Sequence, residues 1–386
     1  SGISNILIGS NAGDALTSGN YNVAIGKNAL TTEDEHGRNI AIGHNALYYL
    51  NAGADAYNVA IGYEAGVNIT TAADNVIIGG LAGDALTTGS NNVAIGKEAL
   101  STEDAHGSNV AVGYRALKVQ DAGAEAYNVA VGKDAGLSVS TGTLNTLIGG
   151  LAGDALQEGS SNVAIGYLAL STEDAHGYNT AIGAGALQTQ NAGADAYNVA
   201  VGYDAGLSVT TGVRNTLIGS LAGDNLAGGS YNVAVGMYAL STEDSHGKNV
   251  AIGYSALILQ NAGADAYNVA MGYNAGQAVT TGTANTIIGG LAGDALTTGI
   301  DNVALGYNAL STEDTGSRSV AIGREALRDQ NFDGSAYNIG VGHQAGLFVS
   351  TGVQNTLIGG LAGDSLTTGN YNVALGYGSL GSEDAN

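Results

Sequence analysis

Apolar and polar residues alternate in a five-residue pattern that recurs along the whole 386-residue chain. The pattern is Asn-Val-Ala-Ile-Gly with small variations, and it occurs 22 times. The first copies begin at Asn5, Asn22, Asn39 and Asn58, and this uneven spacing of four copies starts again at Asn75 and recurs to the end of the chain. A fixed period this short predicts a solenoid, because one repeat cannot bury its apolar face alone and must stack on its neighbours.

The repeat length selects the kind of solenoid. Helical solenoid repeats run to about 33 residues or more, whereas 17 to 19 residues fit two short strands joined by two turns. We therefore predict an all-β fold, a parallel β-solenoid of 22 coils in one elongated domain over residues 1–386, about 105 Å long at ~4.8 Å for each coil. Neither end carries an atypical capping repeat, so we expect a segment of a longer fibre.

The alternation within one repeat suggests which side chains point inward. Side chains of a strand point alternately to its two faces. We place the β-branched residues Val23 and Ile25 in the core, so that Asn22, Ala24 and Gly26 point outward. The glycine is present in every repeat, which predicts a corner with positive φ or a close backbone approach. The asparagine column predicts a hydrogen-bonded ladder along the stack.

The third position of the repeat forms a strip of small residues on the predicted outer face. It is mostly alanine, but the first coil of each set of four carries a large aliphatic residue there: Leu7, Ile77, Leu147, Leu217, Ile287 and Leu357. Contiguous exposed apolar surface usually marks an interaction site. We predict that these six residues form a self-association interface, and the alternative is that a turn of the same chain covers the strip.

The extended motif Asn-Val-Ala-Ile-Gly-x-x-Ala resembles the YadA-like (Hep/Hag-type) head repeats of trimeric autotransporter adhesins. It is also similar to repeats predicted in phage tail fibres and marine bacterial surface proteins, and segments 179–183 and 307–310 show this second form. The resemblance covers essentially the whole chain. It implies a left-handed parallel β-roll, packed as a homotrimer, in an extracellular fibre on a cell surface or a virion.

Architecture and resemblance together predict a non-enzymatic protein. We expect a structural or adhesive extracellular fibre, either the head or shaft of a surface adhesin or a phage tail fibre. Its partners would be other copies of the chain, most simply in a trimer, and host-surface or matrix glycans or proteins. The alternative is a subunit of a self-polymerising extracellular filament, in which unpaired strand edges at the two ends of neighbouring subunits dock on each other.

Composition excludes several classes of partner. The formal charge is −23, and the 11 basic residues are scattered, which argues against nucleic acid because a phosphate-binding face needs clustered Lys and Arg. No apolar run approaches the roughly 20 residues that span a bilayer, so we do not expect a membrane-spanning protein. Proline is absent, as a continuous hydrogen-bonded ladder requires.

The second coil of each set carries an acidic turn, Thr-Glu-Asp-x-His-Gly, for example at Glu103, Asp104 and His106. The next coil brings Asp121 to the same edge, and several oxygens within one rung could hold Ca²⁺. The fifth copy lacks the histidine, and the glycine-rich nonapeptide of calcium-binding β-rolls is missing. We favour solvated turn acids that keep the protein soluble, and we assign no metal-binding, cofactor-binding or catalytic residue.

The chain has twenty tyrosines, and it has no set of candidate catalytic groups that occurs only once. Many tyrosines fall at coil edges, where a ring either stacks on a sugar or covers the rim of the core, and we favour the second role. Catalysis needs a cleft with its own set of perturbed groups. Here every candidate group recurs along the stack, so an enzyme is not expected.

Overall fold

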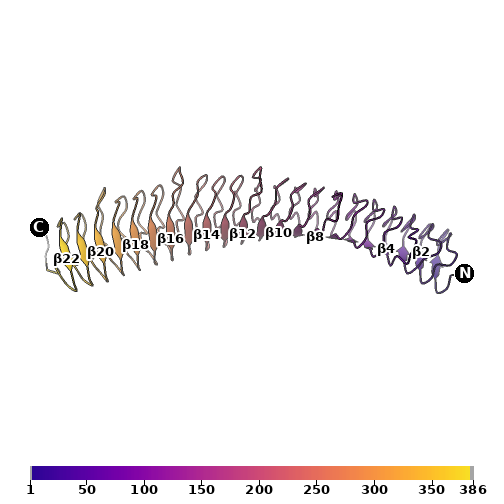
Figure 1. Ribbon diagram of the computed structural model, residues 1–386, viewed down its shortest axis with the longest axis horizontal. Coiled ribbons are helices and arrows are strands. Elements are labelled where there is room, and N and C mark those ends of the chain that lie inside the picture. The colour runs from indigo at the N-terminus through magenta and orange to yellow at the C-terminus, as the bar shows by residue number, and fades with distance from the viewer. Residues whose placement is uncertain (1, 383–386) are drawn as a thin grey trace. The chain divides into compact units, whose positions relative to one another are not determined.

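A computed structural model describes residues 2–382, and within that range the protein is all-β, without an α-helix. Twenty-two parallel strands form a β-solenoid, and equivalent asparagines of neighbouring coils, such as Asn145 and Asn162, are 17 residues apart. The chain divides into two compact units, Ser1–Ala196 and Tyr197–Asn386. Within each unit the strands stack in chain order, as Figure 1 shows, and each pairs with the next in register. The parallel β-solenoid that the period predicts is confirmed.

Each strand has three residues. The strands of the first unit are β1 (Ile6–Ile8), β2 (Val23–Ile25), β3 (Ile40–Ile42), β4 (Val59–Ile61), β5 (Val76–Ile78), β6 (Val93–Ile95), β7 (Val110–Val112), β8 (Val129–Val131), β9 (Thr146–Ile148), β10 (Val163–Ile165) and β11 (Thr180–Ile182). Those of the second unit are β12 (Val199–Val201), β13 (Thr216–Ile218), β14 (Val233–Val235), β15 (Val250–Ile252), β16 (Val269–Met271), β17 (Thr286–Ile288), β18 (Val303–Leu305), β19 (Val320–Ile322), β20 (Ile339–Val341), β21 (Thr356–Ile358) and β22 (Val373–Leu375).

A coil contains one strand rather than the two that its length suggested. The rest of the coil consists of turns whose backbone groups bond to adjacent coils without forming a second strand. Leu168, for example, has a φ of 56° and donates its N–H to Gly150 O at 3.1 Å. The opposite wall is also bonded from coil to coil, since Gly153 N–H donates to Ala169 O at 2.9 Å. Both walls therefore hold neighbouring coils together, although only one has strand geometry.

The core lies on the side of the strand opposite to the one we predicted. In β10 the middle residue Ala164 is completely buried, whereas Val163 and Ile165 are only partly buried. Asn162, just before the strand, is also completely buried. The coil is so narrow that small alanine and asparagine side chains fill its interior from this wall, and leucines such as Leu170 fill it from the other. The assignment of the β-branched residues to the core was wrong.

The large aliphatic residues at the third position of the repeat are core residues for the same reason. Ile77, Leu147, Leu217, Ile287 and Leu357 have no exposed surface in the single chain, and Leu7 is 44% exposed because β1 pairs with β2 alone. Leu147 fills space left by two glycines, because a Cβ at Gly136 would lie 2.7 Å from its Cδ1 and one at Gly153 2.8 Å from its Cδ2. The self-association interface predicted at these residues therefore has no side-chain surface to act through, apart from Leu7.

The glycine after each strand turns a corner at which two coils nearly touch. Gly166 has a φ of 140°, and a Cβ on it would lie 2.4 Å from Gly183 O in the next coil. Positive φ and close backbone approach were the two reasons predicted for this glycine, and both apply. No other residue fits there without moving the neighbouring coil.

The buried asparagines form the predicted ladder, inside the coil rather than outside it. Asn145 Oδ1 accepts the backbone N–H of Asn162 at 2.9 Å, and Asn162 Oδ1 accepts that of Asn179 at 3.0 Å. The Asn145 Nδ2 group donates to Gly159 O, 14 residues further along the same coil, at 2.8 Å. One side chain thus ties its own coil closed and holds the next coil in register.

Adjacent residues of β9 provide a direct test of which face is buried. Leu147→Ala should destabilise the protein by about 2–5 kcal/mol, because it removes a completely buried side chain and leaves a cavity between two glycines. Ile148→Ala, one residue away on the outer face, should cost about 1 kcal/mol or less. Urea unfolding followed by circular dichroism measures both. Equal losses, or a larger loss for Ile148→Ala, would contradict the burial described above.

Candidate functional site

The glutamate of each acidic turn points into the core instead of facing water. Glu103 occupies the place in its coil that Leu86 occupies in the preceding coil, and both side chains are completely buried. Glu33, Glu173, Glu243 and Glu313, at the equivalent positions, are also completely buried. The interpretation of these turns as solvated acids was therefore wrong for the glutamates. It holds for neighbours such as Asp104, which is exposed.

Burial raises the pKa of the glutamate carboxyl group, as Glu103 shows. Glu103 Oε1 accepts the backbone N–H of His106 at 3.1 Å, while Oε2 has no hydrogen-bond partner. Burial raises the pKa of Glu103 to about 7; the bond from His106 opposes this, and the negative charge of Asp121 adds to it. Burial likewise raises the pKa of Glu243 to about 7, against the bond from the backbone of His246.

The second copy of the turn brings four metal-ligating groups together. Potential ligand atoms of Glu103, Asp104, His106 and Asp121 all lie within 4.8 Å of one another. Asp121 comes from the next coil, as its position one rung away predicted. Three-residue versions occur at Glu33, Asp34 and His36, at Glu173, Asp174 and His176, and at Glu243, Asp244 and His246. In the other sets asparagine stands where the second set has Asp121: Asn51, Asn191, Asn261 and Asn331.

The fifth copy has no histidine, and its glutamate is satisfied by the chain itself. Gly316 N–H donates to Glu313 Oε1 at 2.7 Å, and Gln330 Nε2 donates to Glu313 Oε2 at 2.8 Å. Ser319, which interrupts the asparagine column, accepts a second bond from Gln330 at 2.8 Å. This copy is a structural version of the turn, with both carboxylate oxygens bonded.

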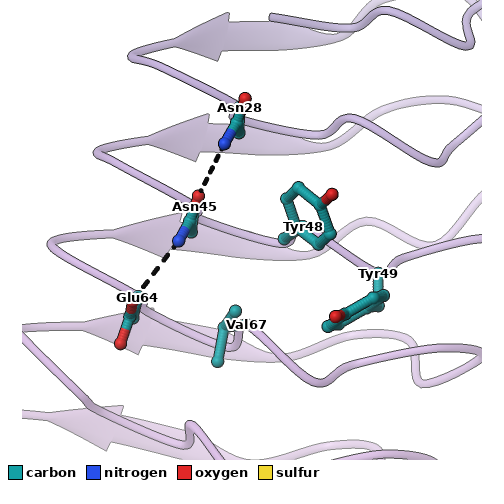
Figure 2. A pocket seen from close by; sticks show the side chains of 6 residues that line it. All are labelled: Asn28, Asn45, Tyr48, Tyr49, Glu64 and Val67. Atoms are coloured by element: carbon teal, nitrogen blue, oxygen red, sulfur yellow. Dashed lines mark hydrogen bonds between the residues drawn. The ribbon is translucent and has the colours of Figure 1, made fainter. Parts of the chain in front are cut away.

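A shallow pocket of about 380 Å³ lies beside the first set of coils (Figure 2). Asn28, Asn45, Tyr48, Tyr49, Glu64 and Val67 line it. Asn28 Nδ2 donates to Asn45 Oδ1 at 3.1 Å, and Asn45 Nδ2 donates to Glu64 Oε1 at 3.3 Å, which makes a polar wall across three coils. The rings of Tyr48 and Tyr49 meet edge to face, with centroids 4.6 Å apart.

Sequence reasoning did not single out this pocket. The signal was available, because the Tyr48-Tyr49 pair occurs in the first set alone, and the corresponding residues of the second set are Lys118 and Val119. A residue pair that breaks an otherwise regular repeat could have indicated a pocket in that set of coils.

The true outer face of the strands carries apolar residues. The second and fourth positions of the repeat hold Val, Ile, Thr, Leu or Met in nearly every coil. Their side chains are partly exposed, for example 37% at Ile148, 39% at Ile218 and 42% at Met271. Within each unit this outer strip, formed by the first and third residues of every strand, follows the whole stack.

Comparison with protein-family models finds no match, and comparison with curated proteins finds none either. Within residues 2–382 no helix is long and apolar enough to cross a bilayer. The features of the molecule that bear on function are therefore the coils, the outer strip, the acidic turns and the pocket.

Glu103 and Glu243 should make stability depend on pH. A carboxyl whose folded pKa lies near 7 stays protonated in the folded state while the unfolded chain loses its proton above about pH 4.5. The free energy of unfolding should therefore fall as pH rises from about 5 to 8, by at most about 1.4 kcal/mol per pH unit for each group. Asp104, Asp121 and His106 surround Glu103 and contribute to its titration.

Replacement of the two strongest cases, Glu103→Gln with Glu243→Gln, should flatten this pH dependence and raise the melting temperature at pH 8. Thermal unfolding in the presence of a chelator between pH 5 and pH 8 measures it. Glu158→Gln, in an exposed turn, is the matched control and should leave the profile unchanged. A stability that does not fall through pH 7, or a profile that the double variant does not alter, would count against buried protonated glutamates.

Proposed function

We propose that this chain forms a non-enzymatic extracellular fibre, structural or adhesive, as part of a surface adhesin or a phage tail fibre. The repeated bonding between coils supports a fibre, because each coil is held by its neighbours and the stack gains length by adding coils. The resemblance to YadA-like head repeats favours the extracellular setting, a left-handed coil and a threefold assembly. The observation that carries the proposal furthest is the apolar outer strip.

The outer strip is large enough for association between copies. Eleven rungs at ~4.8 Å and three residues at ~3.3 Å each give roughly 500 Å² for each unit, which already matches the largest apolar patch on an ordinary monomer. A standard interface buries about 800 Å² per partner, so the strip of one unit supplies more than half of that area. We propose that copies of this chain associate through this strip, in place of the buried residues first assigned to that role.

The charge of −23 on each copy sets a condition on this assembly. Like-charged chains repel one another, and dissolved salt screens that repulsion over about 10 Å at 0.1 M. Association through an apolar strip should therefore strengthen as salt is added, whereas an assembly held by ion pairs would weaken.

Charges placed on the outer strip should separate the copies without unfolding the coils. Ile148→Lys with Ile182→Lys places two cations on exposed positions of the strip. Sedimentation analysis should show a multiple of the 38.1 kDa chain for the native protein and a single chain for the variant, with unchanged circular dichroism. Thr141→Lys with Gln157→Lys, in exposed turns, should leave the assembly intact. A native protein that is monomeric at micromolar concentration would refute the association.

Electron microscopy of the same samples separates the two kinds of fibre. Discrete particles of one length support a segment of an adhesin or a tail fibre. Long unbranched filaments that grow with protein concentration would support the alternative, a self-polymerising subunit.

The pocket favours saccharide contact as an adhesive role. Sugar-binding surfaces combine an aromatic ring, which packs on the C–H face of the sugar, with amide and carboxylate groups that bond its hydroxyls. Tyr49 is 51% exposed at the pocket, and the polar wall of Asn28, Asn45 and Glu64 offers both donors and acceptors. We propose that this pocket contacts glycans on a host surface or matrix.

A glycan array with the full chain tests this contact. Tyr48→Ala and Tyr49→Ala should each weaken the retained glycans at least tenfold, because each removes part of the aromatic wall. Tyr167→Ala, an equally exposed tyrosine outside the pocket, should bind as the native chain does. An array with no retained saccharide, or binding unaffected by both pocket variants, would rule out this role while leaving the fibre proposal standing.

A further inference from the structure

Buried polar atoms without partners recur at the same place in successive sets. Glu103 is completely buried and its Oε2 is unpartnered, and the same is true of Glu173 and Glu243. The buried Nδ1 atom of His106 also lacks a partner, as do the equivalent atoms of His36, His176 and His246. Buried polar groups in folded proteins almost always have a partner. The unpartnered imidazole nitrogen of His106 and a buried carboxylate with one unpartnered oxygen belong to one cluster of possible ligands, which points to a bound ion.

The distances in the cluster fit a cation better than a direct hydrogen bond. His106 Nδ1 lies 3.7 Å from Glu103 Oε1, and the equivalent distances are 3.9 Å at His36 and 3.5 Å at His176. These separations exceed a hydrogen bond of about 3.2 Å. Two ligands about 2.1 Å from one tetrahedral ion lie roughly 3.4 Å apart, so small side-chain movements would bring both atoms into coordination.

We propose that the turn formed by Glu103, Asp104, His106 and Asp121 binds a zinc ion. One imidazole nitrogen with carboxylate oxygens is a ligand set that Zn²⁺ accepts, whereas Ca²⁺ and Mg²⁺ favour oxygen ligands alone. Asp121 belongs to the coil after the one that carries the other three ligands, so the ion joins two coils. The three-residue turns at His36, His176 and His246 bind the same ion more weakly.

The backbone holds this turn in place before any ion arrives. Thr87 Oγ1, in the preceding coil, donates to Asp104 O at 2.8 Å. Gly107 follows His106 where a Cβ would lie 1.7 Å from Ser90 O, so the chain passes the preceding coil at the closest approach that glycine allows. Asp121 donates its own N–H to Ser140 O at 2.8 Å, which fixes the fourth ligand from the following coil.

The repeats supply internal comparisons for each part of the site. Only the second set has an aspartate at the position of Asp121, where Asn191 stands in the third set. The fifth set has lost its histidine, and both oxygens of Glu313 are bonded by Gly316 and Gln330. In the first set the backbone N–H groups of His36 and Ala52 bond both oxygens of Glu33, so among the described residues the unpartnered oxygen belongs to the second, third and fourth sets.

Calorimetric titration of the full chain with Zn²⁺ alone, at pH 7.5, tests the site. The native chain should show one tight site and weaker ones, and His106→Gln should remove the tight site. Asp121→Asn should lower its affinity about tenfold or more, to the level of the other sets. Asn191→Asp should raise the affinity of the third set by a similar factor. His343→Gln, an exposed histidine outside these turns, should change nothing.

Three results would overturn the proposal. The first is no binding of Zn²⁺ at micromolar concentration. The second is binding that His106→Gln and Asp121→Asn leave unchanged. The third is binding of Ca²⁺ that needs Glu103 and not His106, which would make the site an oxygen-only cation site. Circular dichroism checks the fold of each variant. Should His106→Gln not fold, Asp121→Asn and Asn191→Asp, at positions that are not buried, decide between the outcomes.

Discussion

The bond from the side chain of one buried asparagine to the backbone N–H of the next is the constraint on which the other features depend. In the step from Asn145 to Asn162 this bond fixes the register of two coils, while the second half of the same amide closes the turn at Gly159. A buried amide left without these partners costs about 1–3 kcal/mol, so a slipped register is penalised wherever the column carries asparagine. Register in turn aligns the acidic turns, the polar wall of the pocket and the outer strip, because each is built from equivalent positions in successive coils.

The solenoid, its period and its corner glycine could be predicted because they depend on spacing and on backbone geometry. The inside and the outside of the strand could not be predicted from the preference of Val and Ile for buried strands. That preference reflects fit to a pleated surface with room for large side chains. Here the interior at this wall is only wide enough for Asn162 and Ala164, so volume decides which face is buried and the β-branched residues point outward. The single strand per coil was missed for a related reason, since turn segments also bond from coil to coil.

In the candidate sites, too, the features that depend on spacing could be predicted and those that depend on packing could not. The spacing correctly placed Asp121 beside the turn of Glu103, because one rung of a parallel stack brings equivalent positions together. The burial of the Glu103 side chain could not be predicted, since a turn rich in acidic residues is normally solvated. The information lay in the column, because Leu86 precedes this glutamate at the same position of the coil. The pocket depends on the packing of Tyr48 against Tyr49, for which the repeat pattern has no equivalent.

The packing of Leu147 between Gly136 and Gly153 has a consequence for how such a chain can change its length in evolution. The leucine belongs to one coil, and one of the glycines that make room for it belongs to the coil before. Deletion of the coil before Leu147 would place this leucine against Leu117, and deletion of its own coil would leave Gly136 facing a void. A change by one whole set of four coils, such as the segment from Asn75 up to Asn145, restores every pairing across the junction. The set of four coils is thus the unit whose duplication or deletion preserves the packing. Natural variants of this chain should therefore differ in length by multiples of that set.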